Sequence, residues 1–127
     1  MRIAFIVLLA LHGIAHLPGF VVAWQFGVLR DMPYHTTLLS GRMDVGDGGI
    51  RVLGVLWLLV GVAFEIAAAG AIWHKAWWGP LTAVAAAISL GMTLLQLPEA
   101  RIGAVVNVVI LCLLALGQYA TWEKMIL

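Results

Sequence analysis

Charged residues are scarce in this sequence. Asp, Glu, Lys and Arg together account for 10% of its 127 residues, whereas hydrophobic residues account for 64%. Since a soluble domain carries about 25% charged residues, this composition excludes an ordinary soluble protein and predicts an integral membrane protein surrounded by the lipid bilayer. The formal net charge of +1 also argues against a nucleic-acid partner, because such a partner demands a strongly basic face.

Cysteine is nearly absent, since Cys112 is the only one. It can form no disulfide within the chain, and its place in an apolar run predicts a small buried core residue. Length is also limited, because 127 residues leave room for about four membrane spans of roughly 20 residues each. We therefore predict a single integral membrane domain over residues 1–127.

Long apolar runs are what the sequence does contain, and four of them predict an all-α fold, a four-transmembrane-helix antiparallel bundle. The predicted helices cover about residues 3–29, 50–72, 77–97 and 102–122. Since the connections after the second and third helices are short, successive helices must run in opposite directions, which places both termini on one side. The segment 30–49 is rich in glycine and aspartate and predicts a long polar loop.

Two histidines occupy the first apolar run. His12 and His16 are four residues apart, so on a helix they project from the same face, one turn apart. Ionisable side chains in a membrane span usually face the interior of a bundle and mark a functional site. Pro18 and Gly19 follow directly and predict a kink, which frees a backbone carbonyl near Ile14 that needs a partner inside the bundle.

The other three apolar runs each carry one stripe of small or polar residues. In the second run Gly61 and Glu65 are four residues apart, and glycine stripes allow helices to approach each other closely. Ser89 and Thr93 share one edge of the third predicted helix, and Asn107 lies in the fourth. Two interpretations stay open: hydrogen bonds that only hold the helices together, or a polar site inside the bundle.

Depth in the membrane relates two of these residues. His16 lies fourteen positions before Arg30, and Glu65 lies fourteen positions after Arg51. At about 1.5 Å per residue, both are roughly 20 Å from the long-loop boundary. We therefore predict that His16 and Glu65 form a hydrogen-bonded pair and are the catalytic candidates, because a carboxylate within lipid needs a partner.

Two kinds of ligand would suit such a site. A divalent metal would take His12, His16 and Glu65 as its ligands, since imidazole and carboxylate groups both coordinate such ions. A quinone or another apolar ligand would instead accept a hydrogen bond from His16 and be protonated through Glu65. The residues predicted to bind the cofactor are His12, Ser89, Thr93 and Asn107.

A family resemblance adds to this reading. Arg2 opens the first run, which ends in His-Leu-Pro-Gly-Phe at 16–20, Leu53-Gly54 is followed by Gly61, and Asn107 lies in the fourth run. This pattern resembles that of the DoxX-like proteins, small membrane proteins with four helices. Some members of that family are associated with quinone-linked oxidation of sulfur compounds or with redox-stress complexes. The resemblance implies a redox-linked accessory membrane protein, and we expect it in the cytoplasmic membrane of a bacterium.

Two other classes stay open. Four short helices with one buried glutamate are also similar to the small multidrug resistance exporters, and this likeness implies proton-coupled transport through Glu65. A purely structural subunit, in a homo-oligomer or a larger membrane complex, would instead use Ala83, Ala87 and Gly91 as a packing surface.

Overall fold

The structure, a computed structural model, describes residues 2–119 and is mainly helical. Three of its segments are long and apolar enough to cross a membrane: Arg2–Ala23, Gly46–Ile72 and Trp78–Leu95. A shorter apolar helix covers Arg101–Gly117, and the predicted end of the last helix at 122 lies outside the described residues. In chain order the helices are α1 (Arg2–Ile14), α2 (Leu17–Ala23), α3 (Gly46–Ile72), α4 (Trp78–Leu95) and α5 (Arg101–Tyr119).

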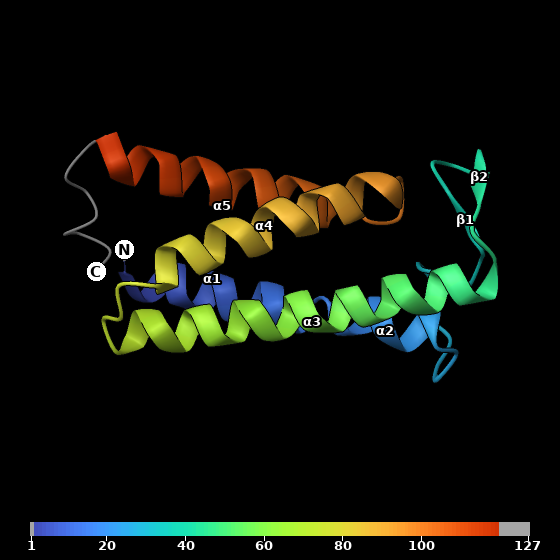
Figure 1. The fold of residues 1–127 in the computed structure, drawn as a ribbon, viewed down its shortest axis with the longest axis horizontal. Coiled ribbons are helices and arrows are strands. Elements are labelled where there is room, and N and C mark those ends of the chain that lie inside the picture. The colour runs from blue at the N-terminus through green and yellow to red at the C-terminus, as the bar shows by residue number, and fades with distance from the viewer. Residues whose placement is uncertain (1, 120–127) are drawn as a thin grey trace.

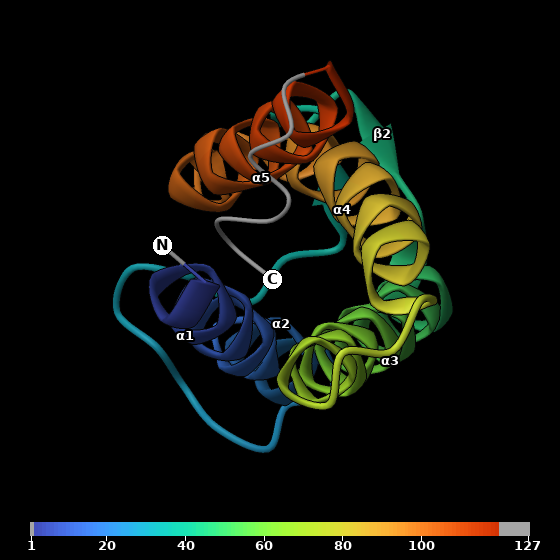
Figure 2. The same cartoon turned by 90° about the vertical axis from the view of Figure 1, so that its left-hand side faces the viewer.

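The helices lie along the length of the molecule (Figure 1). α2 continues roughly in the direction of α1, whereas α3, α4 and α5 each reverse the direction of the helix before them. Viewed along their axes, α1, α3, α4 and α5 form an arc in that order, with α1 and α5 at its two ends (Figure 2). Packing follows the same order, because α3 contacts both α1 and α4, and α4 contacts α5.

The first apolar run forms two helices rather than one. α1 stops at Ile14 and α2 begins at Leu17, which confirms the predicted kink next to Pro18. α2 then ends at Ala23, so the predicted helix end at 29 is wrong by six residues. The reason is Gln25, which adopts a left-handed conformation with φ 58° and so closes the helix.

The end of α2 is a Schellman motif formed without glycine. The amide of Phe26 donates to the carbonyl of Val21 at 2.9 Å, and the amide of Gln25 donates to the carbonyl of Val22 at 3.0 Å. α3 ends in the same way around His74, whose φ is 56°. The end of α3 at Ile72 confirms the predicted end at residue 72, whereas α2 stops at a residue that carries no obvious stop signal in the sequence.

The segment between α2 and α3 is the predicted polar loop, and it contains a short hairpin. Strand β1 (Thr37–Leu38) pairs antiparallel with β2 (Met43–Asp44), with Thr37 opposite Asp44. α3 begins at Gly46, four residues before the predicted start at 50. The predicted loop is therefore confirmed, although it starts and ends earlier in the chain.

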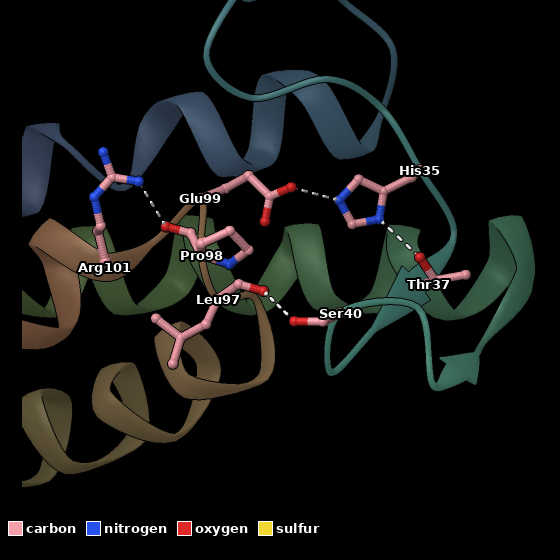
Figure 3. A network of polar contacts seen from close by, with 7 residues as sticks. All are labelled: His35, Thr37, Ser40, Leu97, Pro98, Glu99 and Arg101. Atoms are coloured by element: carbon pink, nitrogen blue, oxygen red, sulfur yellow. Dashed lines mark hydrogen bonds and ion pairs between the residues drawn. The ribbon is translucent and has the colours of Figure 1, made fainter.

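Side-chain contacts hold this loop against the connection between α4 and α5 (Figure 3). Ser40 Oγ donates to the carbonyl oxygen of Leu97 at 3.3 Å, and His35 Nε2 lies 3.4 Å from Glu99 Oε1. The amide of Leu39 also donates to the carbonyl of Leu95, at 2.8 Å. The loop is thus fixed over one end of the helices.

α1 and α3 approach each other closely where two glycines meet. A Cβ added at Gly13 would lie 2.9 Å from the carbonyl oxygen of Gly61, and one added at Gly61 would lie 2.9 Å from that of Gly13. At the other end of this pair, the Arg2 guanidinium donates to the carbonyls of Ala71 and Ile72 at 2.7 and 2.8 Å. It thereby satisfies carbonyl groups in the last turn of α3.

The apolar core lies between the helices. Leu9, Phe64, Ala67 and Ile110 are fully buried in it. Cys112 is exposed, so the predicted buried position of this residue is wrong. It lies two residues after Ile110, and at about 100° per residue this places it on the opposite side of α5.

Candidate functional site

Four buried polar side chains meet in the interior. His12 comes from α1, His16 from the turn before α2, Ser89 from α4 and Asn107 from α5. His12 Nε2 lies 2.8 Å from Asn107 Oδ1. Asn107 Nδ2 lies 2.8 Å from Ser89 Oγ, which in turn lies 2.7 Å from His16 Nε2. We call these four residues the polar network, and it brings together four of the six predicted site residues.

The break between α1 and α2 anchors the polar network. The amide of His16 donates to the carbonyl of Gly13 at 3.1 Å, whereas a continuous α-helix would join it to the carbonyl of His12. The side chain of His16 replaces that bond, because its Nδ1 lies 2.7 Å from the carbonyl oxygen of His12. The carbonyl of His12, two residues before the one predicted to be freed near Ile14, therefore finds its partner in a side chain of the site.

The direction of each hydrogen bond follows from this anchor. A carbonyl oxygen only accepts, so His16 Nδ1 carries the proton and Nε2 of the neutral ring is an acceptor. The Ser89 hydroxyl therefore donates to His16 Nε2 and accepts from the amide nitrogen of Asn107. The Asn107 oxygen is left to accept from His12 Nε2, which fixes the tautomer of His12.

Two aromatic residues of α3 enclose the histidines. The Phe64 ring centre lies 4.9 Å from that of His12 and 5.3 Å from that of His16, and the Trp57 ring lies 5.1 Å from that of His16. Trp57 Nε1 also donates to Gln96 Oε1. Sequence reasoning missed both residues. Their separation by seven, which places them on one face of a helix two turns apart, is the signal that would have found them.

A cavity of about 370 Å³ lies between α1 and α5, directly beside the polar network. This volume is within the range of about 300–1,000 Å³ that is typical of small-molecule sites. His12, His16 and Trp57 line it on the inner side. Most of the remaining wall is apolar and comes from α1 and α5, through Leu8, Leu11, Ile102 and Val106.

The long loop reaches this cavity at one end. Met32 from the loop and Glu99 from the connection between α4 and α5 both line the cavity. Figure 3 shows Glu99 pointing toward His35 of the loop. The contacts that fix the loop therefore also define one end of the cavity.

Thr93 is buried as predicted, but it does not join the polar network. Its hydroxyl donates to the carbonyl of Leu90, in the preceding turn of its own helix, at 2.9 Å. Its side chain still lines the cavity, and its Cγ2 would lie 3.1 Å from a Cβ added at Gly103. Thr93 thus contributes to the shape of the cavity more than to its polarity.

The predicted pair of His16 and Glu65 is not formed. Both ring nitrogens of His16 are bonded elsewhere, and Glu65 is exposed, with no hydrogen bond to any residue within 2–117. Phe64 takes the interior position in its place, since burying an aromatic ring costs far less than burying a carboxylate. The point on the first span that faces Glu65 was also predicted about one turn too late in the chain, because Glu65 lies against Gly13 and not against His16.

The predicted metal site is contradicted for the same reason. Glu65 lies outside the polar network, while His12 and His16 are already bonded to side chains and a backbone carbonyl. Among the described residues, no three His, Cys, Asp or Glu side chains lie close enough together to hold a metal ion. A site of two histidines would lack the three or four protein ligands that such ions usually take.

Comparison with protein-family models, with curated proteins and with solved structures found no match to this chain. The resemblance to DoxX-like proteins therefore stays a prediction. The polar network and the cavity beside it are the features that point to a function.

Proposed function

We propose that this protein is a small integral membrane protein that binds a quinone-type ligand, meaning an apolar ring with polar oxygens, in the cavity between α1 and α5. The observation that carries the proposal is the junction of two unlike surfaces in one cavity. Leu8, Ile102 and Val106 offer an apolar wall, while His12 offers a ring nitrogen close to it. Ligand sites commonly combine a mainly apolar lining with a few fixed polar groups.

Access from the bilayer supports the same ligand class. Leu11 and Ile102, which line the cavity from its two sides, have exposed fractions of 60% and 73%. The cavity wall thus continues onto the outer surface of α1 and α5. A ligand dissolved in lipid would reach His12 sideways between these two helices, without passing through water.

The proposal includes the membrane arrangement. The chain would form a four-span antiparallel bundle in the cytoplasmic membrane of a bacterium, with α1 and α2 together as one span and α5 as the fourth. A redox-linked accessory role, of the kind implied by the resemblance to DoxX-like proteins, would suit a protein that holds a quinone. Association with further copies of the chain, or with a larger membrane complex, also belongs to the proposal.

Ligand-induced stabilisation tests the proposal. Decylubiquinone, added to the protein in detergent, should raise the unfolding temperature in a saturable way, since a ligand at 100 times its Kd stabilises a protein by about 2.7 kcal/mol. Ala15→Phe places a ring in the cavity and should abolish this shift, whereas Ala87→Phe, on an exposed face of α4, should leave it unchanged. A shift of equal size in both variants would contradict the cavity as the site.

Proton-coupled transport is a second candidate, and the position of Glu65 favours it. This residue is exposed in the apolar helix α3, at a point where Gly13 leaves space beside the carboxylate. A carboxyl group at the surface of a membrane span would exchange protons with a substrate that reaches it through lipid. In proteoliposomes with a pH gradient, uptake of ethidium that depends on Glu65 and survives Glu65→Asp, but not Glu65→Gln, would support this function.

A further inference from the structure

One ring nitrogen in the polar network is still free. His12 uses Nε2 to donate to Asn107, and its Nδ1 has no hydrogen-bond partner among residues 2–117, whose side chains the structure describes. In the described part of the chain, Arg2 Nε is the one side-chain polar atom that is fully buried and lacks a partner, so His12 Nδ1, which also lacks one, is not fully buried. His12 Nδ1 is therefore open to the space beside it. Since His12 lines the cavity, we infer that this space is the cavity.

The chemical character of this atom is fixed by the polar network. In a neutral imidazole one nitrogen donates and the other accepts. Reversing the Asn107 amide would require Ser89 to donate to Asn107, and His16 Nε2 would then need a second proton, which charges a fully buried ring. The uncharged network thus has one direction only. In that direction His12 Nδ1 is an acceptor.

We propose that the cavity selects the reduced, hydroquinone form of its ligand over the quinone, through a hydrogen bond from a ligand hydroxyl to His12 Nδ1. This inference rests on the proposed function and adds the redox state of the ligand to it. A hydroquinone presents an O–H group to the acceptor. A quinone presents only carbonyl oxygens, so two acceptors would face each other, and the nitrogen that the ligand covers would stay without a partner.

The apolar surroundings increase this preference. Phe64 packs edge-to-face against the His12 ring at 4.9 Å, and the neighbouring lining residues Leu8 and Val106 are apolar. Few other donors are therefore available to satisfy Nδ1 when a quinone occupies the cavity. Sites built to pair with a substrate hydroxyl discriminate strongly against analogues that lack it. We expect a ratio of dissociation constants of at least about tenfold, which corresponds to about 1.4 kcal/mol.

The test compares tetramethylhydroquinone with tetramethylbenzoquinone, which differ by two hydrogen atoms. Their dissociation constants are measured anaerobically, from the ligand dependence of the unfolding temperature of the full chain in detergent. The hydroquinone is expected to bind at least about tenfold more tightly. Equal affinities, or a tighter quinone, would overturn the preference while leaving the proposed ligand class intact. Binding of neither compound would overturn both.

A variant at His12 identifies the source of the preference. His12→Phe keeps a ring against Phe64 but removes both nitrogens, so the two dissociation constants should become equal within about twofold. Val7→Ala, at an exposed position on the same helix, should keep the wild-type ratio. If His12→Phe does not fold, His12→Gln retains a terminal N–H for Asn107 and should also reduce the ratio. A ratio that persists in the folded His12 variant contradicts the role of Nδ1.

Discussion

His12 and Asn107 join the first and last helices of the described chain through a single hydrogen bond of 2.8 Å, although 95 positions separate them. α1 and α5 lie at the two ends of the arc of helices (Figure 2). The cavity lies between the same two helices. This contact is therefore both a structural link across the ends of the arc and part of the wall on which the proposed ligand binds.

Removal of the Asn107 side chain should destabilise the protein strongly. Asn107→Leu leaves the N–H of His12 without an acceptor in the interior, and such an unsatisfied group costs about 1–3 kcal/mol. It also removes the donor to the Ser89 oxygen, whose hydroxyl keeps its bond to His16. The free energy of unfolding, measured by reversible denaturation in mixed detergent, should fall accordingly. Val105→Ala, on the exposed side of the same helix, should change it by less than about 0.5 kcal/mol. Similar effects from both substitutions would mean that the polar network contributes nothing to stability.

Ser89 and Thr93 should differ, although they lie one turn apart and both are buried. Ser89→Ala removes the donor to His16 Nε2 and should cost about 1–3 kcal/mol of unfolding free energy. Thr93→Val keeps the shape of the side chain and removes only a bond to the preceding turn of α4, so it should cost less than about 1 kcal/mol. The comparison uses the same denaturation assay, and a larger loss for Thr93→Val would contradict the assignment of the network.

The contact between α1 and α3 should not tolerate a methyl group. Gly13→Ala forces the new Cβ to within 2.9 Å of the Gly61 carbonyl oxygen and 2.5 Å of Glu65 Oε1, so the helices must separate. We expect a loss of about 1–3 kcal/mol, the usual cost of overpacking. Gly91→Ala is the matched control, because a Cβ there meets nothing within 4 Å. It should be neutral or stabilising by up to about 1 kcal/mol in thermal unfolding.

The start of α3 should respond to acid through Asp44. Hydrogen bonds from the backbone amide of Gly46 and the side chain of Thr36 lower the pKa of the Asp44 carboxyl below its usual value of 3.8. Its stabilising effect is therefore complete above that value and is lost as the pH falls through the lowered pKa. The amide NMR signal of Gly46 in micelles should titrate with a midpoint below 3.8. Asp44→Asn should remove this titration, and a wild-type midpoint above 3.8 would contradict the bond.

Much of the polar network could be predicted from the sequence. His12 and His16 share a helix face because they are four residues apart, and Ser89 and Asn107 are rare polar side chains within apolar helices. Such residues turn inward because lipid offers them no hydrogen bonds. The structure places all four in one buried cluster. Their roles in binding or catalysis stay predictions.

The position of Glu65 could not be predicted from the same rules. Neighbouring residues on a helix differ by about 100° in direction, and the stripe through Gly61 passes between Phe64 and Glu65. Which of the two faces inward depends on the relative cost of burying a ring and a carboxylate. It also depends on the space beside Gly13, which has no side chain and so leaves room for the Glu65 carboxylate. The position of that space depends on how α1 is rotated about its axis, and the sequence of α3 does not determine this rotation.

The end of α2 was the other source of error, whereas the end of α3 at Ile72 was predicted correctly. Gln25 adopts a left-handed conformation with φ of 58° and ends α2 there. This region of backbone space is uncommon for residues other than glycine, so Gln25 carries no recognisable sequence signal. Apolar residues also continue beyond Gln25 in Phe26, Val28 and Leu29. Hydropathy alone therefore extended the first predicted helix too far.

The most direct measurement of the central claim is photo-crosslinking with an azido-quinone in proteoliposomes, followed by mass spectrometry of the labelled peptides. Label should concentrate on the cavity-lining parts of α1 and α5, around Leu11 and Ile102, and an excess of decylubiquinone should remove it. Label should also disappear in Ala15→Phe. Labelling spread over the outer faces of α3 and α4, or labelling that decylubiquinone does not displace, would contradict a quinone site at His12.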